Sequence, residues 1–214
     1  FQNDVAFAGA IPEENIEVSG GTFLGEYGCY GYGNQKFITG GTFNADVSEY
    51  CAEGFVLHDN GDGTYGVVEY FAAQIGDTKY KTLEEAIAAV PTDGTETEII
   101  LLEDIVAGEN DGYTISTGQN VVLDLNGKTL SKVKAETLTK NDALIEVKKE
   151  ATLTIDDSGT GGSIEYQYTG ESTGWGGKSS SAIVNNQGTL VVNGGTVKNL
   201  TAVETQIAYA IDNL

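Results

Sequence analysis

The chain has 214 residues, and 32 acidic residues against 11 lysines, with no arginine, give it a formal net charge of -21. This charge repels nucleic-acid phosphates and anionic lipid, so it argues against both as partners. A normal apolar share of 40% and 11 tyrosines argue against disorder, and 2 prolines among 29 glycines exclude a collagen-like chain. No apolar stretch approaches the ~20 residues that span a bilayer, so no membrane insertion is expected.

A glycine phrase repeats in the first 70 residues, which we take as a β-rich segment and a first domain. Residues 18–23 (VSGGTF), 38–43 (ITGGTF) and 192–197 (VNGGTV) share the order apolar, any residue, Gly, Gly, Thr, apolar. Internal repetition of this kind predicts stacked coils of strand, with a glycine pair turning a corner once per coil. Two β-rich runs around the Asn-Gly and Asp-Gly turns at 59–64 then predict a hairpin.

Cys29 and Cys51 are the only cysteines, and two alternatives stay open for them. A disulfide would close a loop of about twenty residues and contribute roughly 3 kcal/mol. The other alternative is two buried thiols in adjacent coils. With the single His58, the pair offers too few ligands for a zinc site.

Asp59 and Asp62 are calcium candidates, because they sit with glycines in a short acidic turn. Their spacing departs from the EF-hand pattern of alternating oxygen ligands with a glutamate at the twelfth position. A plain hairpin turn is therefore the preferred interpretation. The sequence indicates no cofactor.

Residues 71–214 form the second expected domain, which opens with a helix at 82–90. Thr82 followed by Glu85 is a capping box. Leu83, Ala86, Ile87 and Val90 share one helical face, and Pro91 and Gly94 end the helix.

After the helix, two families of apolar strands recur at a coil-like spacing. The first family is 121–125, 151–155 and 189–192, and the second is 143–147, 182–186 and 210–213. This pattern predicts a mainly β fold: a right-handed parallel β-helix, or solenoid, with one short capping α-helix. Asn185 and Asn213 fall at equal places in the second family, so we expect them to form an amide ladder. The alternative, an antiparallel sandwich, would need turn signals roughly every 8 to 12 residues.

The string 75–87 (IGDTKYKTLEEAI) resembles the N-terminal cap of pectate-lyase-like β-helix domains in large surface proteins of gut Firmicutes. Residues 40–65 are similar to the way such a domain ends. The resemblance implies a non-catalytic, adhesin-like or structural module, secreted or at a bacterial cell surface. Its implied partners are a glycan or a host or bacterial surface protein. The closing phrase precedes the opening one, so the chain resembles the end of one module and the start of the next, and head-to-tail self-association is a further expectation.

The same resemblance keeps a second function open, a fragment of a polysaccharide lyase or glycoside hydrolase. Asp156 and Asp157 are the only adjacent acidic pair placed on a coil. Neighbours along a strand point to opposite faces, so a turn after Ile155 is the preferred interpretation over an acid/base pair. One histidine makes a Ser-His-Asp triad remote, and we expect no enzyme. A self-assembling structural subunit is a third alternative.

The ligand-binding candidates are Trp175, Tyr166 and Tyr168, which lie in a segment that lengthens one coil. Loops that bulge from repeat proteins commonly carry function, and aromatic faces stack on sugar rings. The preferred alternative is that Trp175 folds back to cover the apolar flank of the coil.

Overall fold

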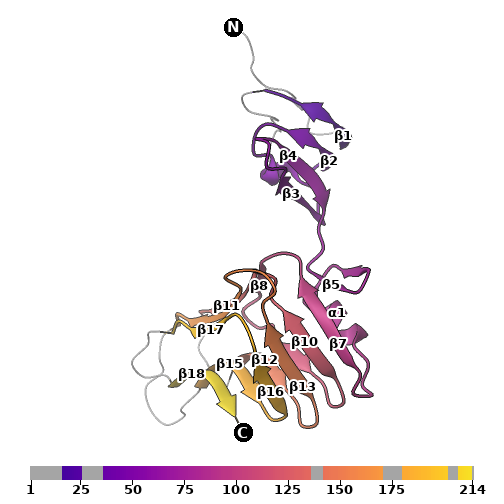
Figure 1. Cartoon of the computed structure of the whole chain (residues 1–214). Helices are drawn as coiled ribbons and strands as arrows, with labels where there is room; N and C mark the ends of the chain where they lie inside the picture. Colours follow the sequence, from indigo (N-terminus) through magenta and orange to yellow (C-terminus); the bar gives the residue numbers. More distant parts are fainter. Residues whose placement is uncertain (1–15, 26–35, 136–141, 171–179, 202–206, 214) are drawn as a thin grey trace. The chain divides into compact units, whose positions relative to one another are not determined.

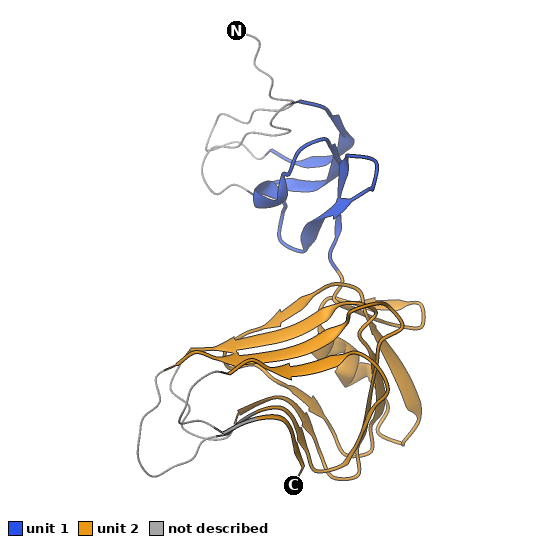
Figure 2. Cartoon of the chain, turned by 60° about the vertical axis from the view of Figure 1, so that its left-hand side comes forward, with its two compact units in different colours: residues 1–70 blue, residues 71–214 orange. Residues whose placement is uncertain are grey.

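The computed structural model describes residues 16–25, 36–135, 142–170, 180–201 and 207–213 (Figure 1). The chain divides into two compact units, residues 1–70 and 71–214, which we describe separately (Figure 2).

The first unit contains one four-stranded sheet and a 3-10 helix. Its strands are β1 (Val18–Phe23), β2 (Ile38–Phe43), β3 (Phe55–Asp59) and β4 (Tyr65–Glu69), in the sheet order β1-β2-β4-β3, and the 3-10 helix is Ser48–Tyr50. The two glycine phrases pair in parallel, with Thr22 opposite Thr42 and Phe23 opposite Phe43. The rings of Phe23 and Phe43 stack with centroids 5.0 Å apart. The repeated phrase is therefore one rung placed on another, as the repetition predicts.

The two glycines of the phrase have different structural roles. Gly21 and Gly41 have φ angles of 100° and 109°, which favour a residue without a Cβ. Gly40 has ordinary backbone angles, but a Cβ there would overlap the carbonyl oxygen of Ser19 in the preceding rung. The first glycine thus permits close stacking, and the second permits the corner.

The hairpin expected around 59–64 is present, because β3 and β4 pair antiparallel with Asp59 opposite Tyr65. Cys51 is a free, buried thiol that donates to the carbonyl oxygen of Val47 at 3.7 Å. Burial raises the pKa of the Cys51 thiol. Cys29 lies outside the described residues, so the disulfide between Cys29 and Cys51 stays an untested prediction.

The second unit opens with a hairpin and a helix, followed by four coils of three strands each. The hairpin is β5 (Ala73–Ile75) and β6 (Thr78–Tyr80), and the helix is α1 (Leu83–Ala89). The first coil is β7 (Glu96–Leu101), β8 (Ile105–Ala107) and β9 (Tyr113–Ile115), and the second is β10 (Asn120–Asp124), β11 (Thr129–Lys134) and β12 (Asp142–Val147). The third is β13 (Thr152–Asp156), β14 (Ser163–Tyr168) and β15 (Ser180–Asn186), and the fourth is β16 (Thr189–Val192), β17 (Thr196–Asn199) and β18 (Ile207–Asn213).

The coils stack so that equivalent strands form three sheets. The first sheet has the order β16-β13-β10-β7-β5-β6, the second β17-β14-β11-β8 and the third β18-β15-β12-β9. Every contact between coils is a parallel pairing, such as Leu123 with Ile155 and Leu153 with Leu190. This confirms a parallel β-helix, visible in Figure 2 as strands lying side by side around a common interior. The antiparallel sandwich is excluded for this unit.

Helix α1 closes the interior beside the first coil. Thr82 and Glu85 form the expected capping box. Leu83 and Ile87 line the same interior cavity as Tyr113, and the volume of this cavity is only about 10 Å³. A void of this size is too small for a ligand, so the apolar interior is a packed core.

The strands of the third sheet bend, and the bend changes the expected asparagine ladder. Leu144 with Ile145, and Ile183 with Val184, are consecutive pairs in which both side chains are buried. The ladder joins Asn186 to Asn213, whose Nδ2 and Oδ1 atoms lie 2.7 Å apart. Asn185 instead lies opposite Asp212, so the predicted Asn185–Asn213 ladder was one residue out of register.

The inward and outward positions of one strand give a direct test of the fold. Leu153 is fully buried in the interior, whereas its neighbour Thr154 is half-buried on the outer face. We expect Leu153→Ala to lower the free energy of unfolding by about 2–5 kcal/mol, because it leaves a cavity in a packed core. Thr154→Ala, the matched control, should change it by less than about 1 kcal/mol. Urea denaturation followed by circular dichroism measures both, and equal losses would contradict the assignment of inward and outward positions.

Candidate functional site

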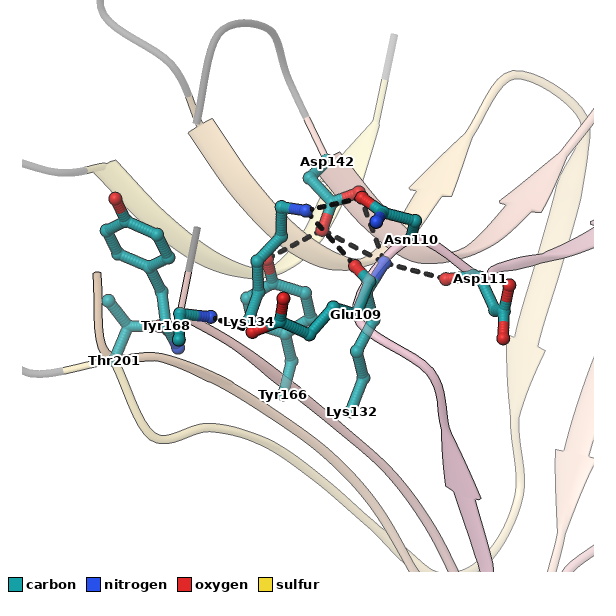
Figure 3. A network of polar contacts seen from close by, with 10 residues as sticks. Glu109, Asn110, Asp111, Lys132, Lys134, Asp142, Tyr166, Tyr168 and Thr201 are labelled. Carbon is teal, nitrogen blue, oxygen red and sulfur yellow. Dashed lines mark hydrogen bonds and ion pairs between the residues drawn. The ribbon is translucent and has the colours of Figure 1, made fainter. Parts of the chain in front are cut away.

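Polar side chains occupy inward positions where the second sheet meets the third (Figure 3). Strand β11 places Lys132 and Lys134 beside the apolar Leu130, and β14 stacks Tyr166 on Lys132 and Tyr168 on Lys134. All four side chains are buried, with Lys132 only 1% exposed. A buried lysine is costly unless it is paired, so its contacts decide what this cluster does.

Lys132 is held by acceptors on two neighbouring segments. Its ammonium donates to the carbonyl oxygen of Asp111 at 2.7 Å and forms an ion pair with the Asp142 carboxylate at 3.0 Å. The Tyr166 hydroxyl donates a hydrogen bond to the same carboxylate at 2.7 Å. The Asp142 carboxylate is therefore fixed from the interior by one cation and one hydroxyl.

Burial raises the pKa of the Tyr166 hydroxyl well above its usual range, and the hydrogen bond to Asp142 and its negative charge raise it further. Tyr166 therefore stays protonated and remains a donor. It acts as a hydrogen-bonding support for Asp142.

Lys134 makes a second set of contacts with the segment after β8. Its ammonium donates to the carbonyl oxygen of Glu109 at 3.2 Å and to Oδ1 of Asn110 at 2.9 Å. The Glu109 carboxylate accepts from the backbone N–H of Ala135 at 2.8 Å. These bonds join the end of β11 to the preceding coil, so Lys134 has a structural role.

A hollow of about 310 Å³ lies beside Asp142. Its lining residues are Gly112, Tyr113, Thr114, Asp142, Ala143, Glu146 and Asn185. We call this feature the third-sheet groove, because β9, β12 and β15 supply six of its seven residues, and Gly112 lies next to β9.

Three stacked residues from successive coils form the polar lining of the groove. Register places Thr114 opposite Glu146, and Glu146 opposite Asn185. The Glu146 carboxylate pairs with Lys148 at 2.6 Å. The Asn185 side-chain oxygen, Oδ1, is buried and has no hydrogen-bond partner within the described part of the chain. A buried acceptor without a donor is costly, which makes Asn185 the clearest unsatisfied group of the groove.

The groove presents mainly hydrogen-bond acceptors. The carboxylate oxygens of Asp142 and Glu146 accept hydrogen bonds, and the Thr114 hydroxyl can donate or accept, whereas the Asn185 Oδ1 is buried. A complementary ligand supplies hydroxyl or amide donors. No cluster of three or more His, Cys, Asp or Glu side chains with metal-binding geometry occurs among the residues that the structure describes.

The structure places the predicted aromatic ligands away from solvent. Tyr166 and Tyr168 are buried in the interior, so they do not offer the exposed stacking faces that the sequence interpretation required. Trp175 lies outside the described residues.

The two calcium candidates, Asp59 and Asp62, stabilise a hairpin turn. Asp59 accepts from the backbone N–H of Gly61 at 2.8 Å, and Asp62 accepts from the hydroxyl of Thr64 at 2.6 Å. These bonds to Thr64 lower the pKa of Asp62. The structure thus has the preferred hairpin turn there, and calcium binding stays an untested prediction.

Asp156 and Asp157 likewise stabilise the turn between the first and second sheets. Asp157 accepts from the backbone N–H of Gly127 at 2.7 Å and from that of Gly162 at 2.9 Å. Asp156 accepts from the N–H of Asp157 itself at 2.8 Å. Both carboxylates are engaged by the backbone around the turn that the sequence predicted after Ile155.

Sequence reasoning missed Lys132, Asp142 and Asn185. The sequence held one signal for the lysine. In β11 every second residue points inward, and these residues are Leu130, Lys132 and Lys134, so two lysines stand where apolar residues are expected. No local pattern marks Asp142, and the strand repeat marks Asn185 only as a ladder residue, because the environment of both depends on the neighbouring coils and on the bend of the third sheet.

The chain matches no protein-family model, no curated protein and no solved structure. In addition, no helix within the described ranges is long and apolar enough to cross a membrane.

The contribution of the buried Lys132–Asp142 ion pair to stability can be compared with that of an exposed ion pair. We expect Lys132→Met to lower the free energy of unfolding by about 3–5 kcal/mol, because it leaves Asp142 without its cation. Adding Asp142→Asn to this variant should recover part of the loss. Lys198→Met, which breaks the exposed pair with Glu165, should cost less than about 1 kcal/mol. Urea denaturation measures all three, and a loss for Lys132→Met no greater than for Lys198→Met would contradict a buried network.

Proposed function

We propose that this protein is a non-catalytic, adhesin-like binding module that is secreted or displayed at a bacterial surface and holds a neutral glycan in the third-sheet groove. The observation that carries the proposal is the groove itself: a hollow of about 310 Å³ whose lining includes Thr114, Asp142 and Glu146. Sugar hydroxyls are donors that match such a lining.

The electrostatics favour a neutral glycan over an acidic one. The chain has a formal net charge of -21, and Asp142 and Glu146 both face the groove. An acidic polysaccharide would be repelled by this field, whereas a neutral sugar is not. This consideration also weighs against the alternative of an enzyme fragment that cleaves acidic polysaccharides.

The internal support of Asp142 fits a binding role. Lys132 and Tyr166 fix its carboxylate from the interior, so this acceptor is positioned before a ligand arrives. A preorganised site loses less entropy when it binds. The adhesin-like placement rests on the resemblance of residues 75–87 to surface β-helix proteins, and the repeat architecture supports it.

Thr114 gives the sharpest test of this function, because it is exposed and lines the groove. On an array of neutral and acidic glycans, we expect the protein to retain neutral glycans. For the best of them, Thr114→Val should weaken binding by about five-fold, the value of one uncharged hydrogen bond. The melting temperature should stay within about 2 °C of the parent, because the replaced hydroxyl lies at an exposed position.

Thr154→Ala, on the outer face of the first sheet, is the matched control and should bind like the parent. Failure to retain any neutral glycan, or unchanged binding by Thr114→Val, would sink the proposal. Release of reducing ends from polysaccharides would instead establish an enzyme.

A further inference from the structure

We propose that the protein associates head to tail, with β1 of one molecule added as the next rung on β16 and β17 of a second molecule. The inference is independent of glycan binding. It concerns two strand edges: β1 ends the sheet of the first unit, and β16 and β17 end two sheets of the second unit, as far as the described strands go. Unpaired edges of this kind are templates for pairing with another chain.

The two edges carry the same eight-residue pattern. Residues 190–197 are LVVNGGTV and residues 16–23 are IEVSGGTF, which agree in their glycines, threonine and other apolar positions except that Glu17 corresponds to Val191. Their backbones also correspond, because the second glycine has positive φ in both, 72° at Gly195 and 100° at Gly21. Gly41 in β2, at 109°, repeats the feature once more. Residues 16–23 therefore have the sequence and the corner of a rung that would follow 190–197.

The structure shows how rungs with this pattern stack. Within the first unit, Thr22 lies opposite Thr42 and Phe23 opposite Phe43. Within the second, Thr196 lies opposite Ser163 and Val197 opposite Ile164. Joining the two series at Thr196 and Thr22 continues both columns without a change of register. The joined inward columns are Ile155, Val192, Val18 and Ile38, and Ile164, Val197, Phe23 and Phe43.

Apolar side chains lie uncovered along the accepting edge. Val192 is 45% exposed, whereas Ile155, one rung earlier in the same column, is fully buried. Ile211 on β18 is 42% exposed, whereas Val184 one rung earlier is fully buried. The added β1 would cover Val192, whereas Ile211 on β18 lies outside the proposed contact and shows only that the last coil is generally less buried.

The space around Gly20 and Gly40 identifies a position where a substitution would block association without disturbing the isolated molecule. A Cβ at Gly40 would overlap the Ser19 carbonyl oxygen of the preceding rung, whereas a Cβ at Gly20 meets nothing within 4 Å. In the proposed assembly Gly20 occupies the place of Gly40, with Asn193 of the second molecule in the place of Ser19. A side chain at Gly20 is therefore tolerated in the isolated molecule and excluded from the assembly.

The pairing surfaces differ on the two partners, so the contact is heterologous and can propagate into a chain of molecules. The formal charge of -21 on each copy opposes this contact. Added salt screens that repulsion, so association should strengthen as sodium chloride rises. A contact held mainly by ion pairs would weaken instead.

Two blocking variants and their mixture test the proposal by sedimentation velocity. The parent protein is expected to form dimers and longer species as protein and salt concentrations rise. Gly20→Arg blocks the donating edge, and Val192→Lys places an ammonium on the accepting edge, where it reaches solvent in the monomer. Each variant alone should remain a monomer, and their mixture should give a dimer at equal stoichiometry and nothing longer.

Thr154→Ala is the association control and should assemble like the parent. Circular dichroism spectra and melting temperatures that match the parent establish that both blocking variants are folded. A parent that stays monomeric at every concentration and salt overturns the proposal. So does a mixture that stays monomeric, or a blocked variant that assembles as the parent does.

Discussion

The structure of the second unit depends on one constraint: a coil of three short strands cannot bury its own inward side chains. Ile155 is fully buried because Leu123 and Val192 lie on either side of it in the same column. Removing a neighbour exposes the column, as the half-exposed Val192 of the last coil shows. Stability in such a solenoid is shared between adjacent rungs, and the two ends are where it is weakest.

The two ends of the second unit meet this constraint differently. Beside the first coil, α1 lays Leu83 and Ile87 against the interior, and Gln119 ties the helix down by donating to the carbonyl oxygens of Ile87 and Val90. At this end the first sheet continues from β7 into the hairpin β5–β6, and the second and third sheets end at β8 and β9. At the last coil the described strands end with β16, β17 and β18, whose outer edges keep the geometry of a rung. The asymmetry gives the solenoid a direction, and head-to-tail pairing follows from it.

The sequence predicted the elements that depend on local pattern. The capping box at Thr82, the hairpin at 59–64 and the parallel solenoid each rest on a short motif or a spacing, and the structure has all three. The predicted Asn185–Asn213 ladder was wrong, because the third sheet bends and buries two consecutive residues of a strand. The alternation of inward and outward residues therefore no longer predicts which asparagine joins the ladder. The sequence interpretation also took Tyr166 and Tyr168 for surface residues. A long connection predicts a loop that leaves the coil. Whether the two tyrosine side chains point inward or outward depends on their register with Lys132 and Lys134.

The buried polar cluster connects the fold to the candidate site. An all-apolar interior would pack as well here as in the rest of the solenoid, since replacing a buried ion pair by apolar side chains is often neutral or stabilising. Lys132 and Tyr166 both direct their polar atoms at Asp142, which lines the third-sheet groove. The cost of burying a lysine is therefore coupled to holding one carboxylate at the groove. This coupling supports the proposal of a ligand in the groove, because a preorganised acceptor loses less entropy on binding.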